Sequence, residues 1–211
     1  MKAMYGVFKI WSDREGKFIV AKGVFTRNFA RLLLSLLAKQ KDYTPSAGGL
    51  AGEEVTLVDK NGNSRGANIV GTCYDNIDVQ NYATVPSSLS IAGHNRGFTL
   101  ARKLYMAIGN GTNAPSPDDH ALGNELMQIP LTSNQEIDND TNTIIKFTGS
   151  ASPSEDITIT EAGVFANIIT SRGRYINSIA YAEVLLDRAT FSAKSFSAGE
   201  TINAEYSITL E

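Results

Sequence analysis

The sequence predicts a mainly β fold, an antiparallel β-sandwich of jelly-roll type with one amphipathic helix near residues 28–40. Two observations lead to this prediction. Roughly ten short segments rich in β-branched and aromatic residues are separated by turn signals, whereas one segment alone has helical periodicity. Composition agrees, because Ser, Thr, Asn and 18 Gly are abundant while charged residues make up 19 %. At 211 residues, the chain is long enough for a single sandwich domain over 1–211.

The first forty residues predict a hairpin followed by the helix. Strands are expected at 4–11 and 17–22, joined by a polar turn that ends in glycine. Asn28 is the expected N-cap of the helix, because asparagine is among the best residues at that position. Leucines at helical spacing give the helix one apolar face, which we expect to pack against a sheet.

A second hairpin is predicted around Asn61-Gly62, since this pair favours a tight hairpin turn. Its strands are expected at 53–59 and 65–74. Together with the irregular stretch that follows, it suggests an inserted hairpin and long loop at 42–103 within the sandwich. We expect residues 75–97 and 133–142 to form long polar loops that contact other molecules.

The rest of the chain predicts further short strands and closes on an amphipathic one. Apolar and polar residues alternate from Ile202 to Leu210, which indicates a final strand built into a sheet. The other strands are expected at 104–108, 125–132, 143–148, 157–160, 174–186 and 189–196.

Charge and cysteine content exclude several classes of function. A net charge of −3 and a pI near 5.5 argue against a nucleic-acid partner. Cys73 is the only cysteine, so an intramolecular disulfide and a cysteine zinc site are excluded. Acidic and basic residues at 13–15 interrupt the N-terminal apolar run, so we expect no signal peptide. No segment approaches the roughly 20 apolar residues of a membrane span, so no membrane insertion is expected.

The residues that usually carry catalysis occur without their partners. His94 and His120 do not form a spaced metal-binding pair. The acidic run Asp138–Asn142 resembles the start of a calcium loop but lacks the glycine and glutamate that should follow, which leaves a weak calcium site as an alternative to a polar turn. We therefore expect no enzyme activity, no catalytic or metal-binding residues and no cofactor.

Three motifs occur in the order known from one family of structural proteins. They are Ala107-Ile108-Gly109-Asn110-Gly111-Thr112 with Pro115, Asp119, Ala121-Leu122 and Glu125; Ile159-Thr160-Glu161-Ala162-Gly163-Val164-Phe165; and Phe196-Ser197-Ala198-Gly199-Glu200-Thr201. This set resembles tail-fibre and related virion structural proteins of tailed phages. Residues 42–102 do not match the pattern, and His120 stands where the pattern more often has Thr.

The motif residues are predicted to hold a loop onto the sandwich. Gly109 and Gly111 are expected to leave a buried strand with positive φ, and Asp119 (or Asp118) to cap a short helix that turns Leu122 and Leu126 inward. Glu161 is expected to accept backbone N–H bonds at a strand corner. The predicted loop clamp comprises Gly109, Gly111, Pro115, Asp119, Leu122, Glu125, Glu161 and Gly163.

The resemblance implies a non-enzymatic protein of the virion exterior, on the tail, the baseplate or the capsid surface. It implies a homo-oligomer, with a trimer favoured, that contacts other virion proteins and a host surface. A carbohydrate-binding module acting in host adsorption is the alternative, with Tyr74, Tyr82 and Phe98 as possible contacts to a host-surface glycan.

Overall fold

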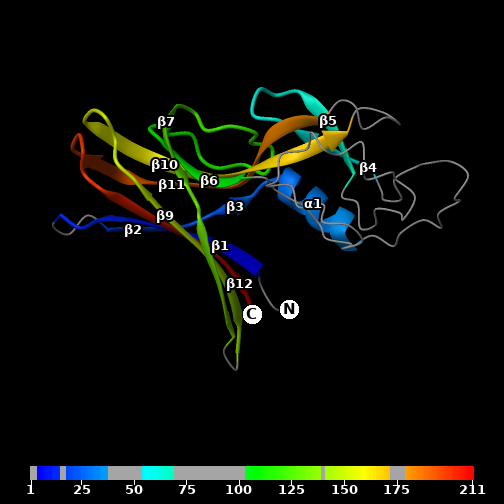
Figure 1. Cartoon of the computed structure of the whole chain (residues 1–211), viewed down its shortest axis with the longest axis horizontal. Helices are drawn as coiled ribbons and strands as arrows, with labels where there is room; N and C mark the ends of the chain where they lie inside the picture. Colours follow the sequence, from blue (N-terminus) through cyan, green and yellow to red (C-terminus); the bar gives the residue numbers. More distant parts are fainter. Residues whose placement is uncertain (1–3, 15–17, 38–53, 69–102, 139–140, 172–178) are drawn as a thin grey trace, which may run out of the picture.

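The computed structural model describes residues 4–14, 18–37, 54–68, 103–138, 141–171 and 179–211 (Figure 1). Within these ranges the chain forms two five-stranded antiparallel sheets and one two-stranded hairpin. The first sheet has the order β2 (Phe18–Lys22), β1 (Met4–Ser12), β12 (Ile202–Leu210), β9 (Thr143–Ala151) and β8 (Ser133–Asp138). The second has the order β3 (Val24–Phe25), β11 (Ile179–Phe196), β10 (Ile157–Ser171), β6 (Lys103–Gly109) and β7 (Glu125–Pro130).

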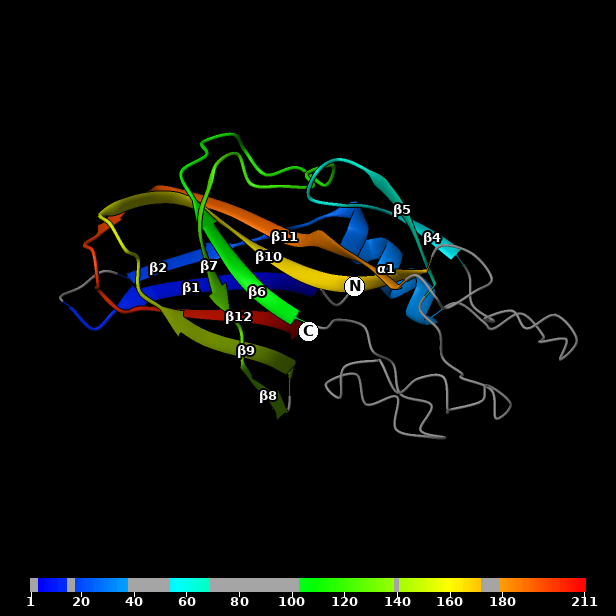
Figure 2. The same ribbon diagram turned by 45° about the horizontal axis from the view of Figure 1, so that its top comes forward.

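The two sheets pack face to face around one apolar core, with β10, β11 and β6 lying over β1, β12 and β9 (Figure 2). Side chains of alternate residues meet in this core because successive residues of a strand point to opposite faces. The first sheet contributes Phe8, Ile10, Ala204 and Tyr206, and the second contributes Met106, Ile108 and Val164. The expected mainly β fold with antiparallel sheets is confirmed, whereas this strand order does not establish a jelly roll.

Helix α1 (Arg27–Leu37) and the hairpin of β4 (Glu54–Val58) and β5 (Ser64–Asn68) lie together at one end of the sandwich (Figure 1). Leu32 of the helix packs with Val55 and Leu57 of the hairpin and with Ala166 and Val184 of the second sheet. Gly62 has φ +80° in the turn, as the Asn-Gly pair predicts. Among the described residues, no helix has the length and hydropathy that a membrane crossing requires.

Four expectations about these elements were wrong. Residues 133–138 pair with β9 as strand β8, so they are not a loop. The expected strands at 174–186 and 189–196 form a single strand from Ile179, and the strand that starts at Ile157 continues to Ser171. Long β10 and β11 pair throughout, and register shifts at two bulges interrupt the alternation on which the shorter expectations rested. The helix begins at Arg27, so Asn28 is not its N-cap.

Candidate functional site

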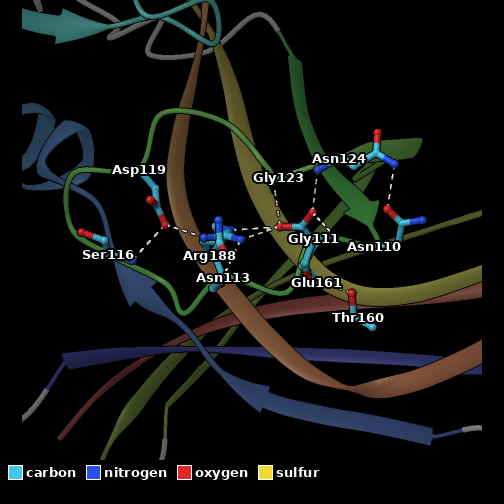
Figure 3. Close-up of polar contacts among 10 residues, drawn as sticks. All are labelled: Asn110, Gly111, Asn113, Ser116, Asp119, Gly123, Asn124, Thr160, Glu161 and Arg188. Atoms are coloured by element: carbon cyan, nitrogen blue, oxygen red, sulfur yellow. Dashed lines mark hydrogen bonds and ion pairs between the residues drawn. The ribbon is translucent and has the colours of Figure 1, made fainter.

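Residues 110–124, which connect β6 to β7, cover the outer face of the second sheet. Two charged side chains of that sheet point up into the loop, Glu161 from β10 and Arg188 from β11 (Figure 3). Glu161 is fully buried and Arg188 is 3 % exposed. Buried charges are rare unless they are paired and hydrogen-bonded, so this pair makes the loop a candidate functional site.

Glu161 accepts five hydrogen bonds. Its Oε1 accepts the backbone N–H groups of Gly111 at 2.7 Å and Asn124 at 3.0 Å. Its Oε2 accepts the N–H of Gly123 at 3.1 Å and the Nε and Nη2 groups of Arg188 at 3.0 and 2.7 Å. Burial alone would raise the pKa of this carboxyl, but the backbone N–H donors and the guanidinium hold the pKa below its ordinary value. Glu161 is therefore an ionised anchor for both ends of the loop.

Arg188 extends the anchor to the middle of the loop. Its Nη1 donates to Oδ2 of Asp119 at 2.7 Å, and its Nη2 donates to the carbonyl of Asn113 at 3.1 Å (Figure 3). Burial lowers the pKa of the guanidinium, yet the bonds to Asp119 and Glu161 outweigh that effect, and the net pKa is raised. We call the three charged residues Glu161, Arg188 and Asp119 the clamp. This set is smaller than the predicted loop clamp, with which it shares Glu161 and Asp119.

Three further hydrogen bonds hold the loop. Asp119 Oδ2 also accepts the N–H of Ser116 at 2.8 Å, and the Thr160 hydroxyl donates to the Gly111 carbonyl at 2.8 Å. At the base of the loop, the Asn124 amide donates to the Asn110 side chain at 2.7 Å. The loop is thus bonded to the sheet or to itself at its start, its middle and its end.

Glycine is needed here for its small size. A Cβ atom built on Gly111 would lie 2.4 Å from Glu161 Oε1, and one on Gly109 would lie 2.3 Å from the Asn124 carbonyl oxygen. On Gly163 it would lie 2.9 Å from the side chain of Leu122. Positive φ is found at Gly62 and Gly199 in the described residues, so the expected positive φ at Gly109 and Gly111 was wrong.

Six of the eight residues of the predicted loop clamp come together at this place. Leu122 packs with Leu185 and Phe165 beneath the loop. Glu125 pairs with Gly109 along β6 and β7, but its side chain forms a bridge to Lys60 of the β4–β5 turn at 3.0 Å. Pro115 sits half-buried in the loop. The six that meet are Gly109, Gly111, Asp119, Leu122, Glu161 and Gly163.

The short helix expected at Asp119 is absent from the loop. Residues 117–118 form a turn, and Asp119 uses its carboxylate for Ser116 and Arg188. Leu126 was expected to face inward with Leu122, but it lies on β7 and is 38 % exposed. Helical spacing therefore gave the wrong geometry for this pair, because residues 123–124 form a bend and Leu126 already belongs to strand β7.

Arg188 is the principal site residue that the sequence did not predict. It stands in the apolar run Leu185-Leu186-Asp187-Arg188-Ala189, between two segments expected to be separate strands. Two adjacent charges inside such a run were the available signal, because a charged residue in the middle of a buried strand needs a partner.

The possible glycan contacts Tyr74, Tyr82 and Phe98 lie outside the described residues, and so do Cys73 and His94. Part of the acidic run 138–142 also lies outside them, and the carboxylate of Asp138 accepts the Thr143 hydroxyl at 2.7 Å. His120 is exposed in the loop. Within the described ranges, no group of three or more His, Cys, Asp or Glu side chains is placed to hold a metal ion.

The hydrogen bonds of the clamp suit a structural role for Glu161. Both oxygens of Glu161 are occupied by donors, and the lowered pKa keeps the group ionised, so it is a poor proton donor or acceptor for a substrate. What the arrangement does is fix the backbone of an exposed loop in one conformation. No family model, curated protein or solved structure matches this chain.

Proposed function

We propose that this chain is a non-enzymatic viral structural protein that assembles into a homo-oligomer on the virion exterior, with loop 110–124 as a subunit contact. The clamp carries the proposal. Two buried charged side chains are used to order an exposed loop, and the residues they hold belong to the motif that resembles phage tail-fibre proteins. A tail, a baseplate and a capsid surface are the candidate places in the virion.

Ordering the loop in advance favours association. A flexible loop loses conformational freedom when it binds, and this loss weakens the contact. Loop 110–124 has already lost that freedom, because its backbone is bonded to Glu161 and Arg188 at both ends and in the middle. The loop still offers exposed side chains, including Thr112, Asn113 and Asp118, the last of which pairs with Arg27 at 2.8 Å. A rigid, polar, exposed loop suits a contact between copies of one protein.

The oligomeric state in solution tests the proposal. We expect size-exclusion chromatography with light scattering to give a mass of several chains, with three favoured by the resemblance. A stable monomer at high micromolar concentration would contradict the proposal.

A charge placed on the loop tests which surface is used. Thr112→Arg puts a long cation on the exposed loop, and we expect it to shift the oligomer toward monomer. Ser154→Arg is the matched control, because Ser154 is also exposed but lies in the connection between β9 and β10. If both variants assemble like the unmodified protein, the loop is not the contact. Equal dissociation of both variants would also count against it.

A further inference from the structure

Between β2 and β3 the chain crosses from the first sheet to the second through one residue, Gly23. Strand β2 pairs with β1 in the first sheet, and β3 pairs with β11 in the second. Between them, the N–H of Gly23 donates to the carbonyl of Gly6 at 3.0 Å. Strand β3 has only two residues, and β2 is an edge strand, so this crossover has few bonds of its own.

Asp187 lies directly against this crossover. It is on β11 next to Arg188 and points to the opposite face of the sheet, into the space between the two sheets. A Cβ atom built on Gly6 would lie 1.9 Å from Asp187 Oδ2, and one built on Gly23 would lie 2.1 Å from Oδ1. The carboxyl group thus fills the room that two glycines leave.

The carboxyl group is buried with one side-chain partner for its two oxygens. Asp187 is fully buried, and its Oδ2 accepts the hydroxyl of Tyr206 at 2.8 Å. Its Oδ1 has no hydrogen-bond partner among the described residues. An ionised carboxylate with an unpaired buried oxygen is costly, and the neutral acid in the same place costs less.

Among the residues that the structure describes, no cation is placed to pair with Asp187. Strand β12 presents Tyr206, β1 presents Gly6 and the crossover presents Gly23. Its cross-strand partners on β3 and β10 are Phe25 and Val164. Burial is the largest influence and raises the pKa of Asp187 to about 7, against the smaller opposing effects of the Tyr206 hydroxyl and the Arg188 backbone N–H.

We propose that Asp187 is a proton-operated latch on the crossover between the sheets. While the Asp187 carboxyl group is protonated, the N–H of Gly23 stays hydrogen-bonded to the carbonyl of Gly6. When the carboxyl group loses its proton to solvent, segment 18–25 opens locally so that the carboxylate reaches water. The opening stops at Thr26, because the Thr26 N–H donates to Leu186 and the Thr26 hydroxyl donates to Leu185.

Hydrogen exchange at the Gly23 amide tests the latch in the full chain. One proton separates the closed and open states, so the population of the open state should rise by close to tenfold per pH unit between about pH 5 and 6.5. Above pH 8 the population should level off, once intrinsic exchange rates are corrected for pH. In Asp187→Asn the population should stay constant with pH. Asp156→Asn is the matched control, since Asp156 is exposed and should keep the unmodified slope.

A direct titration keeps the proposal testable if Asp187→Asn does not fold. In the unmodified protein with ¹³C-labelled aspartate, one carboxyl resonance should titrate near pH 7. Gly23 protection that is flat with pH, an unchanged slope in Asp187→Asn, or aspartates that all titrate below pH 5 would each overturn the proposal.

Discussion

Two acidic residues of neighbouring strands are equally buried and behave in opposite ways. Glu161 accepts five N–H groups and has a lowered pKa, while Asp187 accepts one hydroxyl group and has a raised pKa. Burial alone therefore does not decide the charge of a carboxyl group. The hydrogen-bond donors that face the carboxyl group decide its charge. Glu161 has five donors and stays ionised, whereas Asp187 has few and binds a proton.

Removing the charge of Glu161 should destabilise the protein strongly. We expect Glu161→Gln to lower the free energy of unfolding by about 3–5 kcal/mol, because Arg188 is left buried without its main counter-charge. Urea unfolding measures this loss. Glu125→Gln is the control, since the half-buried Lys60–Glu125 pair should contribute about 1 kcal/mol or less. Equal losses in the two variants would contradict the assigned role of Glu161.

The close approach of Gly111 to Glu161 should appear as an energetic coupling. We expect Gly111→Ala to cost about 1–3 kcal/mol, because its Cβ would collide with Glu161 Oε1. In a Glu161→Ala background the same change should cost much less, since the colliding atom is gone. A double-mutant cycle measured by urea unfolding gives the coupling. If the losses of stability from Gly111→Ala and Glu161→Ala simply add in the double variant, the backbone at Gly111 and the Glu161 side chain are not in contact.

At the scale of elements, a side chain inside helix α1 ties the helix to the β4–β5 hairpin. The Asn28 amide donates to the Val58 carbonyl at 2.8 Å, and its oxygen accepts the Val58 N–H at 2.9 Å. Thr26 takes the capping place instead, because its hydroxyl accepts the N–H of Phe29 at 3.4 Å. Asn28 thereby joins elements that 30 residues of chain separate.

Asn28→Ala should loosen this contact. We expect the Val58 amide to lose protection from hydrogen exchange and stability to fall by about 1–3 kcal/mol, because a partly buried N–H and a partly buried carbonyl lose their partners. Arg31→Ala is a suitable comparison, since its bond to the Thr56 carbonyl is exposed and should matter less. Unchanged protection of Val58 would rule out the tie.

The sequence predicted individual strands and turns better than it predicted which distant segments they contact. The alternation from Ile202 to Leu210 and the Asn61-Gly62 turn are local signals, and both structures form where expected. Asn28 was misplaced because its amide serves a strand far along the chain. Arg188 was missed for the same reason, because its two carboxylate partners come from distant segments. Long-range pairings of this kind leave no period in a sequence.

At the scale of the whole molecule, the two kinds of buried acid predict a stability maximum in mildly acid solution. The pKa of Glu161 is lowered by folding, so its contribution is present above its ordinary pKa and is lost as the pH falls. The pKa of Asp187 is raised, so its contribution is present below its ordinary pKa and is lost as the pH rises through about 7. Stability should therefore peak near pH 4 to 5.

Urea unfolding across pH 4 to 8 checks this maximum. The loss from Asp187 over that range is at most about 4 kcal/mol, because a shift of three pKa units corresponds to roughly 1.4 kcal/mol per unit. The loss should disappear in Asp187→Asn. A stability that rises steadily from pH 5 to 8 would show that Asp187 is ionised in the folded protein at no cost.

In our proposal, buried charges order loop 110–124 for contact between copies of the chain. Amide hydrogen exchange of the unmodified protein at low and high concentration tests both parts of this proposal. We expect the Gly111, Gly123 and Asn124 amides to be protected at both concentrations by Glu161, and the amide of exposed Thr112 to gain protection only when the oligomer forms. Rapid exchange of the first three amides, or a Thr112 amide indifferent to concentration, would contradict the claim.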